Sequence, residues 1–133
     1  MSGKKILIVD DDPHLVLGLT AKLKACGYRV TCATDALSAI TVARKEAPDL
    51  VILDLGLPAG DGFLVLERMR SLADLVATPV IVLSARDPTD NKKRALDAGA
   101  VAFFQKPPNN HEFLAAIRQA LGETTALSTF LKT

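Results

Sequence analysis

The sequence predicts an α/β fold in which helices cover both faces of a five-stranded parallel sheet. Five short runs rich in Val, Ile and Leu alternate with five segments whose apolar residues recur at helical spacing. Such runs are typical of strands buried on both faces, and their alternation with helices is typical of parallel strands joined by right-handed crossovers. The 133 residues are enough for one domain with its own core. We expect that domain over residues 1–121, followed by a tail or the start of a linker over residues 122–133.

The first half of the chain is predicted to contain three strands and two helices. Asp12 followed by Pro13 predicts the start of the first helix, because Asp favours the N-cap and Pro the first helical turn. Either Thr34 or Asp35 is expected to cap the second helix. Strands are predicted over residues 5–9, 28–33 and 50–54, the second of them near a sheet edge. Residues expected to face the core from the two helices are Leu15, Leu19, Leu23, Cys26, Leu37, Ile40 and Ala43 or Ala47.

The second half begins with turn residues between 57 and 62. Pro79 opens the fourth strand, residues 80–83, and the fifth is predicted over residues 101–105. Asn109 with Glu112 three residues later is a capping-box arrangement at the start of the last helix. Residues expected to face the core are Phe63, Leu66, Met69, Phe113, Leu114, Ile117 and Leu121, whereas Lys92, Lys93 and Arg94 are expected on the outer face of a helix over residues 87–98.

Composition excludes several classes of function. Sixteen basic and fifteen acidic residues give a net charge of +1, so nucleic-acid binding by this domain is not expected. We expect no membrane association and a cytoplasmic location, because the sequence has neither an apolar run long enough to span a bilayer nor a signal-peptide pattern. Cys26 and Cys32 lack the spacing of a metal site, so we expect them to be buried free thiols.

Ionisable and polar residues follow four of the predicted strands. Asp10 and Asp11 follow the first, Asp54 ends the third, Ser84 follows the fourth and Lys106 follows the fifth. The carboxyl ends of parallel strands lie at one edge of the sheet, which is where ligands bind in open α/β folds. We therefore expect three carboxylates, a hydroxyl and an ammonium group to converge there if the strands are neighbours.

Such a cluster needs positive charge. Two carboxylates ~5 Å apart repel by ~3 kcal/mol at an effective dielectric constant of ~20. Lys106 supplies one positive charge, and the oxygen-only remainder favours Mg²⁺, which binds one or two carboxylates and keeps sites for phosphate oxygens and water. Beside a metal and a lysine, the Asp54 carboxylate could attack phosphorus and hold a phosphoryl group, with Ser84 donating a hydrogen bond to it.

These residues resemble the signature of response-regulator receiver domains. The similarity rests on the pair Asp10-Asp11, the stretch LDLGLPAGDG from Leu53 to Gly62, the stretch VLSAR that contains Ser84, and the pair Lys106-Pro107. It covers roughly residues 4–121, with every motif in order. The resemblance implies a doubly wound, flavodoxin-like sheet of strand order 2-1-3-4-5.

The resemblance also implies a function in two-component signalling. Asp54 would take a phosphoryl group from a histidine of a sensor kinase or phosphotransfer protein, as a switch with self-phosphorylation and autodephosphorylation chemistry and not as an enzyme. Asp10, Asp11 and Asp54 would hold Mg²⁺ with a backbone carbonyl of Gly56, and Ser84 would be the switch hydroxyl. Phe103 matches the switch aromatic and Lys106-Pro107 a peptide bond that is usually cis.

Further expectations follow from the family. Phosphorylation would be read by a downstream effector or attached output domain, or by a homodimer, on the surface of the fourth helix, fifth strand and fifth helix. The residues that flank the approach of water to the phosphorus would be Gly56 and Arg86. Arg86 either bonds a phosphoryl oxygen or is an ordinary surface arginine.

Three other readings are less favoured. A phosphatase-type hydrolase normally has a second Asp two residues after its nucleophile, where this chain has Gly56. A receiver that binds partners without phosphorylation would be expected to lose an acid or the lysine. A nucleotide-binding fold would need a Gly-rich loop after the first strand. The sequence leaves open the cognate kinase, the output and whether the receiver stands alone or belongs to a longer protein.

Overall fold

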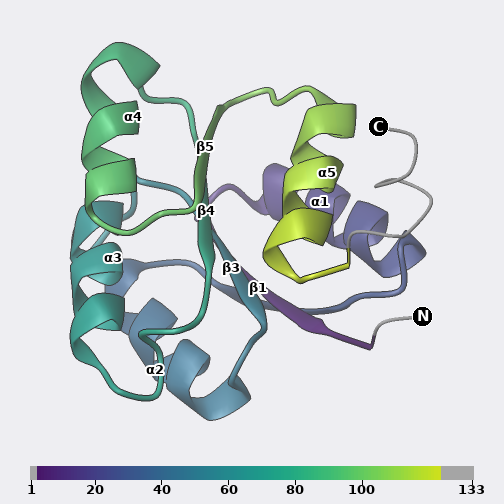
Figure 1. Ribbon diagram of the computed structural model, residues 1–133, viewed down its shortest axis with the longest axis horizontal. Coiled ribbons are helices and arrows are strands. Elements are labelled where there is room, and N and C mark those ends of the chain that lie inside the picture. The colour runs from purple at the N-terminus through teal and green to yellow at the C-terminus, as the bar shows by residue number, and fades with distance from the viewer. Residues whose placement is uncertain (1–2, 124–133) are drawn as a thin grey trace.

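A computed structural model of the chain describes residues 3–123 as five parallel strands in one sheet with five helices (Figure 1). The strands are β1 (Lys5–Val9), β2 (Arg29–Ala33), β3 (Leu50–Leu53), β4 (Val80–Ser84) and β5 (Ala102–Gln105). The helices are α1 (Pro13–Ala25), α2 (Ala36–Glu46), α3 (Gly62–Ser71), α4 (Pro88–Asp97) and α5 (Asn110–Ala120). The strand order is β2-β1-β3-β4-β5, so the predicted fold class and order are confirmed.

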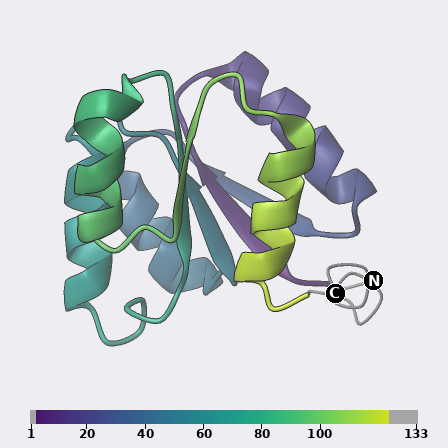
Figure 2. The same ribbon diagram turned by 45° about the horizontal axis from the view of Figure 1, so that its top comes forward.

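Helices cover both faces of the sheet. Helices α1 and α5 lie on one face, and α2, α3 and α4 lie on the other (Figures 1 and 2). Successive residues of a strand point to opposite faces, so each strand contributes to two cores. In β1, Leu7 and Val9 belong to the core under α2, α3 and α4, whereas Ile6 and Ile8 belong to the core under α1 and α5. This double burial explains the continuous apolar runs in the sequence.

Side chains cap each helix at its N-terminus. Asp12 accepts hydrogen bonds from the backbone N–H groups of His14 and Leu15 at the start of α1, as predicted. Asp35, and not Thr34, caps α2. Capping by Asp61, Asp87 and Asn109 starts the other three helices. The caps fix where each loop ends above the sheet edge.

One residue of α2 differs from the prediction, whereas Ala43 is buried and Ile40 packs against the core as predicted. Leu37 is 75% exposed, while the buried residues of α2 are Ala36, Ala39 and Ala43. Those alanines recur at helical spacing, and their small side chains let the helix lie close to the sheet. Leu37 is one residue, or about 100°, away from that face and therefore points outward.

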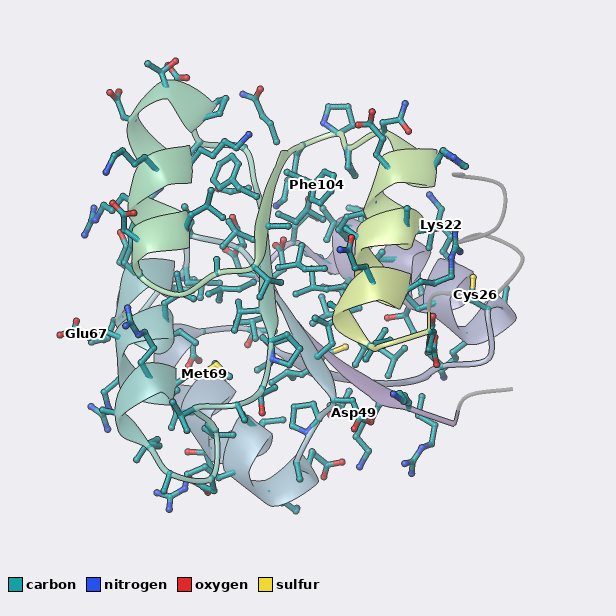
Figure 3. All side chains as sticks on the ribbon, in the orientation of Figure 1. Lys22, Cys26, Asp49, Glu67, Met69 and Phe104 are labelled. Carbon is teal, nitrogen blue, oxygen red and sulfur yellow. The ribbon has the colours of Figure 1, made fainter. Side chains whose placement is uncertain are left out.

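The expected burial of the cysteines is also wrong. Cys26 and Cys32 are both exposed free thiols. Cys26 lies at the C-cap of α1, past the last residue that faces the core (Figure 3). Cys32 lies on β2, which is an edge strand and has a neighbouring strand on one side only.

The end of α5 lies at the predicted domain boundary. Leu121 is the C-cap residue of α5 and is buried. Of the predicted tail, residues 124–133 lie outside the described residues. No helix among residues 3–123 is long and apolar enough to cross a membrane.

Candidate functional site

Asp10 and Asp54 lie next to each other at the carboxyl edge of the sheet. The backbone N–H of Asp10 donates to the carbonyl of Ala33 at 3.1 Å, and that of Asp54 donates to the carbonyl of Val9 at 2.9 Å. Both residues therefore continue the parallel ladder one position beyond β1 and β3, which are neighbours in the sheet. The strand ends bring together two side chains that are 44 positions apart in the sequence.

Three carboxylates meet at this edge. Oxygen atoms of Asp10, Asp11 and Asp54 all lie within 4.8 Å of one another. Asp10 is 3% exposed and Asp54 is 8% exposed, whereas Asp11 faces solvent. Burial raises the pKa of Asp10 above its ordinary value, although the hydrogen bonds from Lys106 and from the Asp12 backbone oppose that rise. The charged form of Asp10 is therefore held at a cost in free energy.

Lys106 supplies positive charge to the cluster. Its Nζ atom lies 2.8 Å from Oδ2 of Asp10 and 3.6 Å from Oδ2 of Asp54. Burial acts to lower the pKa of Lys106, but the hydrogen bond to Asp10 and the charges of Asp54 and Asp10 outweigh it and the pKa is raised. Lys106 therefore stays an ammonium ion, as its predicted place beside the carboxylates requires. The predicted cis peptide bond before Pro107 is present.

Ser84 lies on the other side of the site. It is 1% exposed at the end of β4, and its carbonyl accepts the backbone N–H of Lys106 at 2.9 Å. Its hydroxyl oxygen accepts the backbone N–H of Arg86 at 3.2 Å. The hydroxyl thus has a backbone partner in the loop that follows it, and its own proton remains available to an acceptor.

Two glycines shape the loop after β3 in different ways. The N–H of Gly56 donates to Oδ1 of Asp54 at 3.3 Å, and a Cβ built at Gly56 meets no described atom within 4 Å apart from those of the glycine and its two chain neighbours. A Cβ at Gly62 would instead lie 2.4 Å from the carbonyl oxygen of Asp54 and 2.6 Å from the Cα of Leu55. The start of α3 therefore packs directly on the backbone of Asp54, and only glycine fits there.

The structure shows one contact near the site that the sequence pattern does not indicate. Nη2 of Arg86 lies 2.9 Å from Oδ2 of Asp61, with the two side chains 37% and 43% exposed. The other oxygen of Asp61, Oδ1, accepts the N–H of Phe63 and caps α3. The possible contact between Arg86 and a phosphoryl oxygen stays a prediction. The signal that could have suggested the ion pair is the presence of opposite charges in two loops at the same sheet edge.

Phe103 lies close to the site on β5. It pairs with Val82 of β4 and is 9% exposed, within the core under α2, α3 and α4. Its neighbour Phe104 points to the opposite face and meets Phe113 of α5 edge to face, with ring centroids 5.3 Å apart (Figure 3). The role of Phe103 as a switch aromatic stays a prediction.

The donor atoms of the cluster fit a hard divalent cation. Asp10, Asp11 and Asp54 offer only carboxylate oxygens, which are the ligands that Mg²⁺ prefers in proteins. Burial raises the pKa of Asp10 even though Lys106 donates a hydrogen bond to it. A second cation would lower the cost of this burial, so the residues present fit Mg²⁺. The contribution of the Gly56 carbonyl stays a prediction.

Comparison with known proteins identifies the family. The model of the response regulator receiver domain matches residues 6–118. The transcriptional regulatory protein KdpE of Mycobacterium tuberculosis is 42% identical over 121 residues, a match that covers 91% of this chain and 52% of that protein. The chain therefore spans about half the length of this curated relative.

Solved structures agree with this match. The receiver domain of a sensor histidine kinase from Pseudomonas aeruginosa, with magnesium in its active-site cleft, has a TM-score of 0.82 and 28% identity over 90% of this chain and 98% of that chain. The BeF3-activated receiver domain of RstA from Klebsiella pneumoniae has a TM-score of 0.82 and 30% identity over 88% of this chain and 97% of that chain. The chain belongs to the family of response regulator receiver domains, the signalling switches of two-component systems.

Proposed function

We propose that Asp54 accepts a phosphoryl group from a phosphorylated histidine of a partner protein and that this modification switches a partner-binding surface of the chain. The observation that carries the proposal is the position of Asp54. Its buried carboxylate ends a central strand, beside two further carboxylates and an ammonium group. A carboxylate in that position offers a nucleophilic oxygen, and the nearby ammonium group can stabilise negative charge on the group that it binds.

The transfer is a displacement at phosphorus. A carboxylate oxygen of Asp54 forms a bond to phosphorus, the bond between phosphorus and the donor imidazole nitrogen breaks, and its electron pair returns to the imidazole ring. The product is an acyl phosphate. Water reverses the modification by attacking phosphorus, which releases inorganic phosphate and restores the carboxylate of Asp54. Self-phosphorylation from small donors would use the same step with another leaving group.

Lys106 and Ser84 have separate tasks in this step. Lys106 is an ammonium ion 3.6 Å from Oδ2 of Asp54, so it can move from Asp10 toward a phosphoryl oxygen without crossing the site. Ser84 has an available hydroxyl proton that can be donated to another phosphoryl oxygen. Both interactions become stronger as negative charge develops on the oxygens of the transferred group.

Mg²⁺ would be held by Asp10, Asp11 and Asp54, with Gly56 as a candidate carbonyl ligand. When bound, it would neutralise charge on the phosphoryl oxygens. The chain itself holds the three carboxylates close together at the ends of β1 and β3, against their mutual repulsion.

Partners of two kinds are proposed. The phosphodonor is a sensor histidine kinase or a histidine phosphotransfer protein. The reader of the switch is a downstream effector, an attached output domain or a second copy of the chain that binds α4, β5 and α5. The relative from Mycobacterium tuberculosis is a transcriptional regulator twice the length of the matched segment, which supports an attached output domain.

Phosphorylation with a small donor tests the proposal. The chain is incubated with acetyl phosphate and Mg²⁺, and its intact mass is measured. We expect the mass of one phosphoryl group, absent when EDTA replaces Mg²⁺ and absent in Asp54→Asn. Asp49→Asn is the matched control, because Asp49 lies at the opposite end of β3 (Figure 3). Modification of Asp54→Asn at the wild-type level would refute the proposal.

A further inference from the structure

Arg86 is held at both ends in the loop between β4 and α4. Its backbone N–H donates to the hydroxyl oxygen of Ser84 at 3.2 Å, and its guanidinium group bonds Asp61 at 2.9 Å. The ion pair therefore fixes the residue whose backbone is the partner of the Ser84 hydroxyl. A displacement of Ser84 toward Asp54 would change both contacts.

Asp61 immediately precedes Gly62, the residue that packs on the backbone of Asp54. One oxygen of its carboxylate caps α3 and the other bonds Arg86, so the side chain is held from two directions. The next residue, Gly62, donates its N–H to the carbonyl of Leu55 at 2.9 Å and leaves no room for a Cβ above Asp54. The contacts of Ser84, Arg86, Asp61 and Gly62 thus connect the hydroxyl to the backbone of the phosphoacceptor.

A second contact joins helices α3 and α4 themselves. The guanidinium group of Arg94, on α4, lies 3.7 Å from the ring centroid of Phe63, which follows Gly62 on α3. The loop between β4 and α4 and the helix after it are therefore both held against the start of α3 by an arginine. Of the two contacts, only the one made by Arg86 includes a residue bonded to Ser84.

Phosphorylation would weaken the Asp61–Arg86 ion pair. A phosphoryl group on Asp54 replaces one negative charge by about two at neutral pH, by analogy with other phosphorylated side chains. The added charge would repel the Asp61 carboxylate, whose neighbour Gly62 packs on the backbone of Asp54, and attract the guanidinium group of Arg86. If the ion pair is stronger before phosphorylation than after it, the difference in its free energy between the two states opposes phosphorylation.

We propose that the Asp61–Arg86 ion pair holds the loop between β4 and α4, and with it the Ser84 hydroxyl, in the unphosphorylated arrangement. Asp61 and Arg86 are then positioning residues that set how readily the site changes, and this inference rests on the proposed function of Asp54. Removing the ion pair shifts the population of the unmodified chain toward the phosphorylated arrangement and speeds phosphorylation. A partly exposed ion pair is strong enough for a change of about two- to fivefold.

The test compares four variants of the full chain. Asp61→Asn removes the charge and keeps a good N-cap residue, so α3 retains its start. Arg86→Met removes the charge at the other end, and a double variant joins both changes. Asp74→Asn is the matched control, because it breaks an ion pair of similar exposure, that of Arg44 and Asp74 at 3.0 Å, away from the site.

Two measurements are made on each variant. The first is hydrogen exchange of the backbone amide of residue 86, by NMR without Mg²⁺ or donor. The second is the rate of phosphorylation by acetyl phosphate at a concentration below saturation. Asp61→Asn and Arg86→Met should each raise both rates about two- to fivefold, the double variant should go no further, and Asp74→Asn should match the wild type.

The outcomes separate this inference from the proposed function. If Asp61→Asn is phosphorylated at the wild-type rate, or if its Arg86 amide exchanges no faster, the ion pair does not hold the loop and the inference is wrong. An additive double variant would equally show that the two residues act apart. Failure of the wild-type chain itself to take a phosphoryl group would instead refute the proposed function, and this inference with it.

Discussion

The ammonium group of Lys106 lies closer to Asp10 than to Asp54, at 2.8 Å against 3.6 Å. The lysine is thus bonded to Asp10 and lies farther from Asp54, the proposed phosphoacceptor. One ammonium group faces three carboxylates, and burial raises the pKa of Asp10 in spite of it. We therefore expect the cluster to destabilise the fold when no metal is bound, and this can be measured.

Removing the charge of Asp11 should stabilise the protein without metal. Asp11 is the exposed member of the cluster, so Asp11→Asn relieves repulsion and leaves the contacts of Lys106 intact. We expect a gain of up to about 1 kcal/mol in the free energy of unfolding in EDTA, after solvent screening. The gain should disappear in Mg²⁺, because the wild type then binds metal more tightly than the variant.

Urea denaturation measures this change. Glu67→Gln is the control, since it removes one negative charge from the outer side of α3, away from the cluster (Figure 3). A lower or unchanged midpoint for Asp11→Asn in EDTA would mean that the three carboxylates do not repel one another appreciably.

Alanine should destabilise the protein at Gly62 but have little effect at Gly56. Gly62→Ala places a Cβ 2.4 Å from the Asp54 carbonyl oxygen, whereas Gly56→Ala places one in open space. Replacing a helical glycine by alanine normally stabilises by up to ~1 kcal/mol, but we expect the clash at Gly62 to cost about 1–3 kcal/mol. Gly56→Ala should change stability by less than ~0.5 kcal/mol. Equal midpoints for the two variants in urea would contradict the close packing of α3 on Asp54.

The alkaline stability of the protein should depend on Tyr28. Burial raises the pKa of this hydroxyl above its ordinary value of 10.0, and the hydrogen bond to Glu123 at 2.7 Å raises it further. A raised pKa contributes stability that is complete below the unfolded value and is lost as pH rises through the folded value. Wild-type stability should therefore fall more steeply above pH ~10 than that of Tyr28→Phe, by at most about 1.4 kcal/mol per pH unit.

Absorbance reports this titration directly, because Tyr28 is the only tyrosine and the chain has no tryptophan. Tyrosinate absorbance should appear at higher pH in the folded protein than in urea. Glu123→Gln should move the folded titration part of the way down, leaving the effect of burial. Identical curves for folded and unfolded protein would show that the hydroxyl is solvated.

The sequence predicts those parts of the site that depend on strand ends. Asp10, Asp54 and Ser84 each lie at the end of a continuous apolar run. Such runs are recognisable in the sequence because both faces of a parallel strand are buried. Leu37 was misplaced because two apolar faces compete in α2, and the small alanines prevail through close packing. The ion pair between Asp61 and Arg86 could not be predicted from periodicity, because it joins side chains of two loops that are separated in the sequence.

Chemical trapping of the modified residue tests the central claim most directly. The chain is phosphorylated with acetyl phosphate and Mg²⁺, the acyl phosphate is reduced with borohydride, and the product is located by peptide mass spectrometry. An aspartyl phosphate is converted in this way to homoserine. We predict homoserine at position 54 alone, with Asp10, Asp11 and Asp61 unchanged. Homoserine at any of those three positions, with residue 54 still aspartate, would contradict the assignment of Asp54 as the phosphoacceptor.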